Sequence, residues 1–281
     1  MNKKVLETIV DCMPADREMR DIQRIQTKHR MKLVEFWEIE KGDKILEIGC
    51  GQGDTTAVLA YYVGESGLVQ GIDIGPESYG SPISLGDSAK YLIHSKLGKQ
   101  INMNFNVDVL SPEIDFPNGY FDCIVLSHCS WYFKSKKELI EILSKIKKWG
   151  KKLCFAEWDT NIHKIEQYSH FLSILIQSQL ESFKDNSESN VRTLFTPNEI
   201  IKIAKHAGWT ITNETSIFSP DIQDGQWEIH NVLTEFDEEL QKNGELPIKF
   251  KELLQSEKNM LEEHIKVNKS IPLSVYAFTA K

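Results

Sequence analysis

Three glycines alternate with other residues in the segment ILEIGCGQGD. Gly49, Gly51 and Gly53 directly follow an apolar run at 44–48 and precede a helical pattern at 55–63. Glycine permits positive backbone angles and lets a ligand approach the main chain with no Cβ in the way. The pattern therefore predicts a loop that binds a cofactor, and an incidental glycine-rich turn is the alternative interpretation.

The spacing of these glycines distinguishes two kinds of cofactor. Dinucleotide-binding loops have the spacing G-x-G-x-x-G, in which the third glycine allows close helix packing and the helix start meets a pyrophosphate. Here the spacing is G-x-G-x-G, and Asp54 occupies the position of that third glycine. A carboxylate at a helix start repels a pyrophosphate, so a cofactor without phosphate fits better. An NAD-dependent oxidoreductase remains an alternative.

The segment from about residue 42 to 159 resembles the class I methyltransferases that use S-adenosylmethionine (SAM). The resemblance rests on the motif E-x-G-x-G-x-G, which begins at Glu47 within the first apolar strand. It extends more loosely to a capped helix and the final strands. It implies a Rossmann-like α/β fold with a seven-stranded sheet in the order 3-2-1-4-5-7-6, an antiparallel seventh strand, and SAM as the methyl donor.

The resemblance also implies which residues bind SAM. Asp73, at the end of the second predicted strand, would accept hydrogen bonds from both ribose hydroxyls, and Ile74 would cover one face of the adenine. Asp108 would contact the adenine amino group, with the backbone amide of Val109 nearby, and Ser127 would lie under the methionine end. The residues expected around the methionine part are Glu47, Gly49, Cys50, Gly51 and Gly53. Each carboxylate has a purely structural alternative, as a strand end, a loop residue or a buried acid.

Polar and aromatic residues follow the fourth and fifth predicted strands. Ligands of open α/β sheets bind outside the carboxyl ends of the strands. His128 has an ordinary pKa close enough to neutrality for a general base, and a hydrogen-bonded structural histidine is the alternative. Methyl transfer needs a base only when the acceptor must lose a proton. The candidates on the substrate side are His128, Trp131, Tyr132, Glu157, Trp158 and Asp159.

Three further interpretations concern a metal site, a binding module and a lipid-modifying enzyme. His163 and His170 are seven residues apart in a helical pattern near Asp159, but no tight ligand spacing supports a metal site, so none is predicted. A non-catalytic module that binds SAM or S-adenosylhomocysteine (SAH) would have the same glycine loop. A cyclopropane-fatty-acid-synthase-like enzyme would share it too, but that family's extra catalytic residues have no convincing match in this sequence.

Strand and helix patterns alternate through most of the chain, as in a mainly parallel sheet with helices on both faces. Apolar residues alternate with asparagine at 101–107, which is typical of a strand at a sheet edge. An amphipathic helix at 15–38 has His29 on its apolar face. Strands are predicted at 44–48, 68–74, 101–107, 121–126, 152–157, 210–218 and 273–280, with helices at 55–63, 87–97, 138–148 and from the capping box at Thr196 to Gly208.

One domain, 1–281, is expected. Its core would comprise about 41–160, 191–220 and 272–281, and the stretches 161–190 and 221–270 read as helical insertions. Together with the N-terminal helix, these insertions would form a lid over the active site. Such a lid suits a small or mid-sized acceptor better than a large polymer.

Composition limits the partners and the compartment. The net charge is −8 and the sequence has no basic block, so nucleic-acid binding is disfavoured and a small-molecule acceptor is expected. No segment approaches the roughly 20 apolar residues of a membrane span. Glu7 and Asp11 interrupt the first apolar stretch, which argues against a secretory signal. Five scattered cysteines without a CxxC pair indicate a reduced, cytoplasmic protein. The oligomeric state is not indicated.

Overall fold

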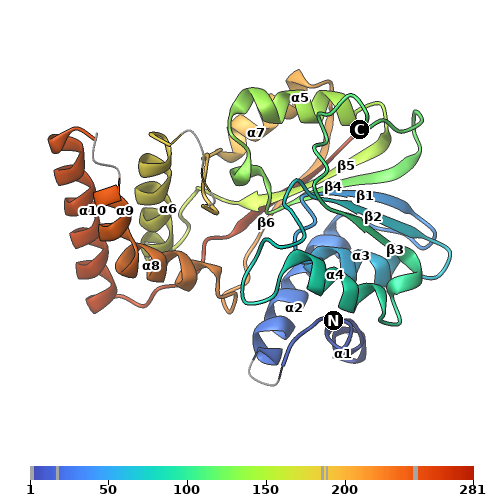
Figure 1. Ribbon diagram of the computed structural model, residues 1–281, viewed down its shortest axis with the longest axis horizontal. Coiled ribbons are helices and arrows are strands. Elements are labelled where there is room, and N and C mark those ends of the chain that lie inside the picture. Colours follow the sequence, from blue (N-terminus) through green and yellow to red (C-terminus); the bar gives the residue numbers. More distant parts are fainter. Residues whose placement is uncertain (1–2, 17–18, 185–186, 188, 243–245) are drawn as a thin grey trace.

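The computed structural model describes residues 3–16, 19–184, 187, 189–242 and 246–281. It contains a β-sheet with helices on both faces and a second group of helices beyond one end of the strands (Figure 1). The chain passes into this second group after β5 and again after β6, and it returns through β7. Because β7 runs antiparallel to β5 and β6, all three connections lie at the carboxyl end of the parallel strands.

The strands form one seven-stranded sheet in the order β3-β2-β1-β4-β5-β7-β6. The predicted fold class, strand order and antiparallel seventh strand are therefore confirmed. β4 is apolar along almost its whole length because helices cover both faces of the sheet there. The strands are β1 Lys44–Ile48, β2 Leu68–Ile72, β3 Ile101–Asn104, β4 Phe121–Ser127, β5 Gly150–Trp158, β6 Ile211–Ile217 and β7 Val275–Ala280.

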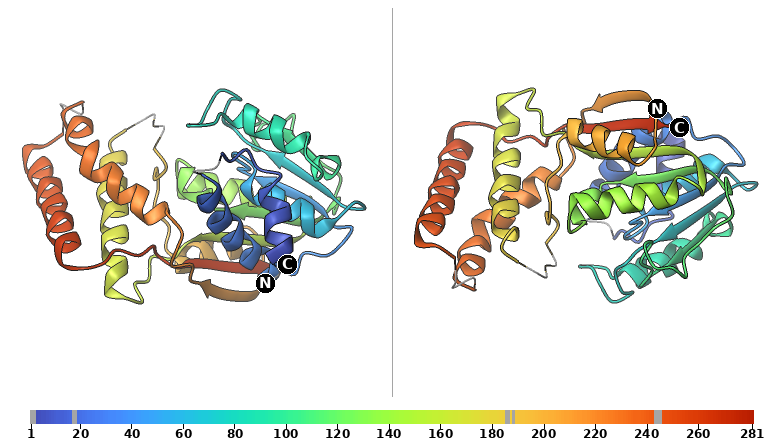
Figure 2. Two further views of the ribbon diagram at one scale, coloured as in Figure 1. Left: turned by 90° about the horizontal axis from the view of Figure 1, so that it is seen from below. Right: turned by 90° about the horizontal axis from the view of Figure 1, so that it is seen from above.

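Helices α2, α3 and α4 cover one face of the sheet, and α5 and α7 cover the other (Figure 2). α7 begins with the predicted capping box, in which Thr196 and Glu199 exchange hydrogen bonds. The helices of this part are α1 Lys3–Val10, α2 Arg20–Phe36, α3 Asp54–Val63, α4 Leu85–Ile93, α5 Lys136–Ile146 and α7 Pro197–His206, with the 3₁₀ turns η1 Gly98–Gln100 and η2 Ser130–Tyr132.

The two predicted helical insertions pack against each other. They contain η3 Ile165–Gln167, α6 Tyr168–Glu181, α8 Asp224–Thr234, α9 Phe236–Lys242 and α10 Ile248–Val267. Their buried side chains, among them Ile176, Val232 and Leu254, form a hydrophobic cluster distinct from the main core. We call this group the helical unit. The N-terminal helices, in contrast, pack on the sheet part, where α2 lies against α3.

Several predicted boundaries were wrong because loop contacts end two strands and serine side chains begin two helices. β2 ends at Ile72 and β3 at Asn104, both earlier than predicted. Asn106 has a positive φ of 57°, and the next amide, that of Val107, donates to the carbonyl of Asp73 in a loop contact. α4 and α5 begin earlier than predicted because serine side chains cap their first turns.

The N-terminal helix predicted at 15–38 corresponds to α2, which is shorter, and a separate helix, α1, precedes it at Lys3–Val10. α1 was missed because its charged residues interrupt the apolar run, although Ile9 and Val10 are buried. Gly53 occupies the N-cap position of α3 and therefore provides no side-chain cap, and Asp54 accepts a hydrogen bond from Gln23 at 2.8 Å.

The helix predicted to carry both His163 and His170 begins only at Tyr168. His163 precedes it and lies 3.4 Å from Asp159 (Nε2 to Oδ2), whereas His170 is buried beside Trp158. The two histidines therefore do not share a helix face. Within the described residues, no group of three or more His, Cys, Asp or Glu side chains could hold a metal ion, and no helix is long and apolar enough to cross a membrane.

Candidate functional site

The glycine loop joins β1 to α3 in a conformation that side chains tolerate poorly. Gly49, Gly51 and Gly53 have φ values of +71°, +52° and +89°. A Cβ on Gly49 would lie 2.7 Å from the Cβ of Cys129, while the corresponding space at Gly51 is open. Glycine is therefore required at 49 by close packing and at all three positions by the backbone angle. The loop exposes main-chain atoms of Gly49 and Gly51 to a cavity.

Asp73 joins the glycine loop to the end of β2. Its Oδ2 accepts the amide hydrogen of Gly51 and its Oδ1 that of Gly75, both at 2.8 Å. The carboxylate is half-buried and faces the cavity. Each carboxylate oxygen accepts more than one hydrogen bond, so both can still receive a hydroxyl from a ligand. The side chain is thus held in a fixed orientation with its remaining acceptor capacity toward the cavity.

Three more predicted cofactor residues line the same cavity. Ile74 is 63% exposed beside Asp73, which leaves its apolar side chain free to cover a flat ring. Asp108 and Val109 follow β3, and Asp108 accepts the amide hydrogen of Leu110 at 2.8 Å through Oδ1. The ends of β1, β2 and β3 therefore place a glycine loop, two carboxylates and an exposed isoleucine around one space.

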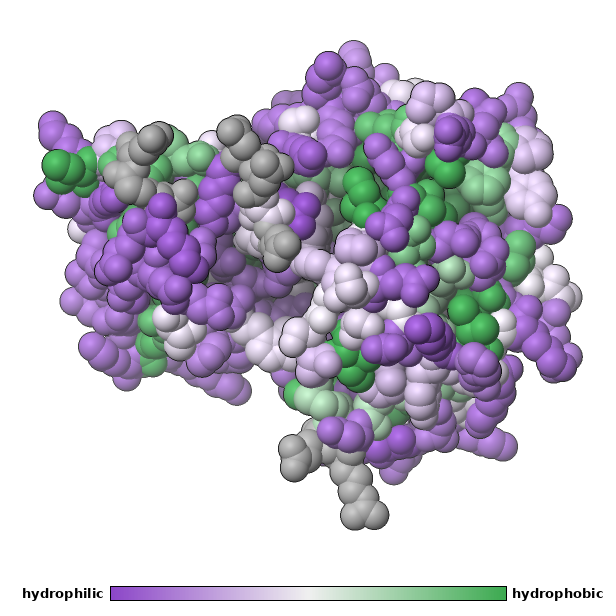
Figure 3. All heavy atoms as spheres, viewed as in Figure 1, coloured by the Kyte–Doolittle hydropathy of each residue, from purple (hydrophilic) through white to green (hydrophobic). Residues whose placement is uncertain are grey.

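The cavity has a volume of about 2010 Å³ and extends from the carboxyl ends of the strands to α5 and α6. A typical small-ligand site occupies about 300–1,000 Å³, so this space can hold a nucleoside-sized cofactor together with a second molecule. Figure 3 shows the hollow where the sheet part meets the helical unit, whose visible surface is mainly hydrophilic. α6 contributes the polar wall residues Ser178, Gln179, Glu181 and Ser182.

Three residues expected around the methionine part of SAM do not line the cavity. Glu47 is buried, accepts a hydrogen bond of 2.5 Å from Thr56, and has its pKa raised to about 8 by burial. The Cys50 side chain packs beside Gly71, and burial raises the pKa of its thiol. Gly53 faces apolar side chains of the core. These residues support the loop from behind.

His128 follows β4 and has a positive φ of 52°, an unusual backbone conformation for a non-glycine residue. Its Nε2 lies 3.1 Å from Nε2 of His29 in α2. Its Nδ1 is buried 3.7 Å from Oε1 of Glu157, without a hydrogen-bond partner among the described residues. Burial, together with the nearby charge of Arg30, lowers the pKa of His128 to about 3. This arrangement favours the structural interpretation of His128 over a general base.

Glu157 holds the turn that follows β4. Its Oε2 accepts hydrogen bonds from the amide and the hydroxyl of Ser130 at 3.0 and 2.7 Å, and its Oε1 accepts the amide hydrogen of Trp158 at 3.0 Å. Burial raises the pKa of Glu157 to about 7, which these hydrogen bonds partly oppose. The turn positioned in this way carries Tyr132, whose ring faces the cavity.

The other predicted substrate-side residues are buried in the wall. Trp131 is less than a tenth exposed, and Trp158 packs between the rings of His128 and His170 at 5.0 and 5.1 Å. Ser127, expected under the methionine end of SAM, is buried in the same way. Asp159 accepts two hydrogen bonds from Asn161. Of the candidates after β4 and β5, only His128 and Tyr132 line the cavity.

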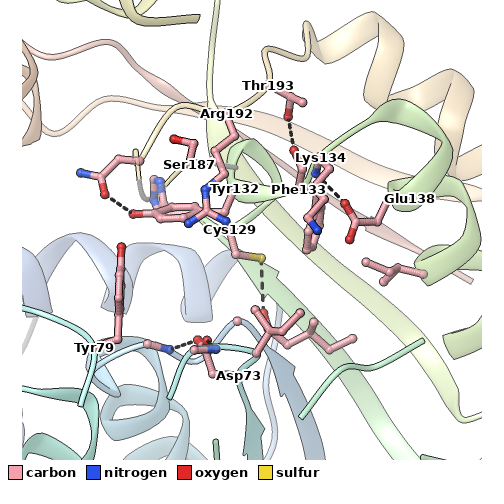
Figure 4. Close-up of a pocket in the computed structure, with 18 of the residues that line it drawn as sticks. Asp73, Tyr79, Cys129, Tyr132, Phe133, Lys134, Glu138, Ser187, Arg192 and Thr193 are labelled. Carbon is pink, nitrogen blue, oxygen red and sulfur yellow. Dashed lines mark hydrogen bonds between the residues drawn. The ribbon is translucent and has the colours of Figure 1, made fainter. Parts of the chain in front are cut away.

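Several residues of the site were not anticipated from the sequence. Tyr79, Lys134 and Arg192 line the cavity from three separate loops (Figure 4). Loop positions have no periodic pattern, so nothing in the sequence indicates that these loops meet. His29 did leave a signal, because a histidine on the apolar face of a helix must find a buried polar partner.

Comparisons with known proteins agree with this geometry. A family model described as a methyltransferase domain matches residues 20–214. The methyltransferase phomM′ of Diaporthe leptostromiformis is 25% identical over 75% of this chain and 64% of its own length. A C-methyltransferase of ubiquinone/menaquinone biosynthesis (UbiE) from Vibrio cholerae is 31% identical over 43% of each chain. The chain thus spans less than two thirds of the fungal relative.

A solved structure resembles the whole chain. The crystal structure of a cyclopropane-fatty-acyl-phospholipid synthase-like protein from Lactobacillus casei has a TM-score of 0.87 and 33% identity, with both chains covered completely. The helical unit is thus part of the arrangement that the two chains have in common.

Proposed function

This chain belongs to the SAM-dependent methyltransferase family, and on that premise we propose that it transfers a methyl group from SAM to a polar small molecule bound in the cavity. The observation that carries the proposal is Asp73. Its carboxylate is oriented by two backbone amides beside an open glycine loop, at one end of a space large enough for two ligands.

The residues present fit SAM. The space beside Gly51 is open, and a Cβ at this position would take up part of the space in which the cofactor would lie. The side chain of Ile74 is exposed beside Asp73. Asp54, in the first turn of α3, keeps the helix start unsuited to a pyrophosphate. Asp73 would hold the ribose hydroxyls, and Ile74, Asp108 and Val109 would surround the adenine. When bound, SAM supplies a methyl group activated by a sulfonium.

The protein's contribution to the transfer would be orientation and exclusion of water. Holding two reactants in line can lower a barrier by roughly 7–11 kcal/mol. Tyr132 and the turn held by Glu157 would position the acceptor, and α6 would close the far side of the cavity. Because Nε2 of His128 faces His29 and its Nδ1 is buried beside Glu157, we propose no proton transfer through it. Acceptors that need no deprotonation during attack therefore fit best.

The name of the Lactobacillus casei protein raises a second candidate, transfer to the acyl chain of a lipid. An acyl chain requires a long apolar channel, whereas α6 presents serine, glutamine and glutamate side chains to the cavity, and Lys184 follows it on the same wall. Lys136 of α5 and Lys134 just before that helix lie on the wall as well. This lining supports a polar acceptor over a lipid.

Calorimetric titration with SAM, SAH and NAD tests the cofactor. We expect SAM and SAH to bind and NAD not to bind; tight binding of NAD without binding of SAM would contradict the proposal. Release of SAH in the presence of candidate acceptors then separates an enzyme from a module that only binds SAM. Phospholipid vesicles belong in the same screen, and SAH release on vesicles alone would favour the lipid candidate.

A further inference from the structure

Arg192 lies in the wall of the cavity away from the cofactor residues. Its guanidinium is 5.7 Å from the centre of the Tyr132 ring, and its Nε donates to the carbonyl of Ser189 at 3.1 Å. Figure 4 shows Tyr132 and Arg192 on one side of the cavity, with Asp73 and Tyr79 on the other. The Nη groups of Arg192 are the donors left for a ligand.

The backbone that carries Arg192 is fixed to the turn after β4. The amides of Arg192 and Thr193 both donate to the carbonyl of Trp131, at 2.9 and 3.0 Å. The hydroxyl of Thr193 donates to the carbonyl of Phe133 at 3.0 Å. Arg192 is therefore held against the same turn as Tyr132, and its position does not depend on a free loop.

Arg192 has no carboxylate partner among the described residues, whereas two lysines of the cavity wall do have one. Lys136 pairs with Glu199, and Lys184 pairs with Glu181 at 2.6 Å. The protein as a whole carries a net charge of −8, and Arg192 is half-buried with no ion pair to the part of the chain that the structure describes. A planar guanidinium is suited to bind a carboxylate or a phosphate through two parallel hydrogen bonds.

We propose that Arg192 binds a carboxylate or phosphate group of the methyl acceptor. The inference rests on the proposed methyl transfer and specifies its substrate as an anionic small molecule. The apolar part of that molecule would lie against Tyr79, Tyr132 and Phe133, which line the same space.

The topology favours the acceptor over the cofactor as the source of this anion. The cofactor residues follow β1, β2 and β3, on one side of the point where the strand order reverses. Arg192 is attached to the turn after β4, on the other side of that point. The carboxylate of the methionine part of SAM is nevertheless the rival ligand, and the experiment must separate the two.

The test uses protein saturated with SAH and three fluorinated probes observed by ¹⁹F NMR. 4-Fluorobenzoate and 4-fluorophenyl phosphate carry the anion, and 4-fluorobenzamide is the neutral control. We expect at least one anion to bind the wild type, and Arg192→Gln to weaken that binding roughly tenfold or more, since a hydrogen bond to a charged group is lost. The anion affinity of Arg192→Lys should lie between those of the wild type and Arg192→Gln. Lys202 is an exposed residue of α7 away from the cavity, so Lys202→Gln should bind the anion as the wild type does.

The outcomes are distinguishable. Absence of anion binding to the wild type, or equal binding to wild type and Arg192→Gln, overturns the proposal. A tenfold loss of SAH affinity in Arg192→Gln assigns the arginine to the cofactor's carboxylate and also overturns it. If the wild type fails to bind SAH at all, the proposed function itself fails. Thermal unfolding of each variant shows whether it is folded, and Arg192→Lys provides a folded comparison if Arg192→Gln is not.

Discussion

Replacing Asp73 by alanine should abolish most of the cofactor affinity while the protein stays folded. The change removes two hydrogen-bond acceptors from the amides of Gly51 and Gly75, each 2.8 Å away. Both amides lie at the cavity wall, where water can replace the carboxylate. We therefore expect a loss of stability of only about 1–2 kcal/mol.

The loss of affinity follows from the two hydroxyls that Asp73 is proposed to hold. A hydrogen bond to a charged group contributes about 1.5–3 kcal/mol, and the lower figure applies because Asp73 is only half-buried. Two such bonds give about 3 kcal/mol, which corresponds to roughly a 100-fold increase in Kd. The loosened glycine loop can only add to this value.

Calorimetric titration of SAH into wild type and Asp73→Ala measures the change directly. Asp221→Ala, which removes an exposed carboxylate away from the cavity wall, is the matched control and should bind SAH as the wild type does. Urea denaturation gives the stability of both variants. SAH binding to a folded Asp73→Ala protein within threefold of the wild type would refute the assignment of the ribose to Asp73.

Three further changes test the packing and the buried charges. Gly49→Ala should lower the free energy of unfolding by about 2–5 kcal/mol, because alanine would have a positive φ and a Cβ contact of 2.7 Å. Gly119 also has a positive φ but open space around it, so Gly119→Ala should lower the free energy of unfolding by only about 1–2 kcal/mol. Equal losses for the two variants in urea denaturation would contradict the packing argument. The pKa of Glu47 is raised to about 8 in the folded state, so the folded protein still holds this proton at pH values where the unfolded chain has released it. The free energy of unfolding of the wild type should therefore fall by roughly 3–4 kcal/mol, relative to that of Glu47→Gln, as the pH rises from 5 to 8. A constant difference between the two proteins across this range would contradict the burial argument. The pKa of His170 is lowered to about 3 in the folded state, so its contribution to stability is full above pH 6.5 and falls in acid. The wild type should lose about 2 kcal/mol of unfolding free energy between pH 6.5 and pH 5, whereas His170→Asn, whose side chain can still accept the amide hydrogen of Leu273, should not. An equal pH dependence of the unfolding free energy in both proteins would show that the pKa is not lowered.

The parts of the fold that the sequence predicted are those determined by local chemistry. Buried strands, the glycine loop and the capping box of α7 each depend on neighbouring residues, and the strand order followed from the motif's resemblance to a known family. Where the predicted end of a strand was wrong, contacts with another segment of the chain decided the boundary. β3 ends early because Asn106 adopts a positive φ and the following amide bonds to the carbonyl of Asp73 instead of continuing the ladder.

The cofactor half of the candidate site is local in the same sense, since Gly51, Asp73 and Asp108 lie directly after successive strands. The acceptor half is assembled from distant segments. Arg192 reaches the cavity because its amide bonds to Trp131, some 60 residues earlier in the chain. No spacing rule connects these positions. The sequence accordingly indicated the donor, while the acceptor's wall became visible only through tertiary contacts.

The buried histidines explain why the predicted base has no room to act. The rings of His29, His128, Trp158 and His170 lie at successive centroid distances of 5.3, 5.0 and 5.1 Å, from α2 through the ends of β4 and β5 to α6. The column therefore connects the N-terminal helix, the sheet and the helical unit. A histidine that titrated during catalysis would place a charge in the middle of this packing, where burial already lowers its pKa. His128 is thus part of the packing between the N-terminal helix and the sheet, and the proposed recognition of the acceptor depends on residues that face the open space, above all Arg192.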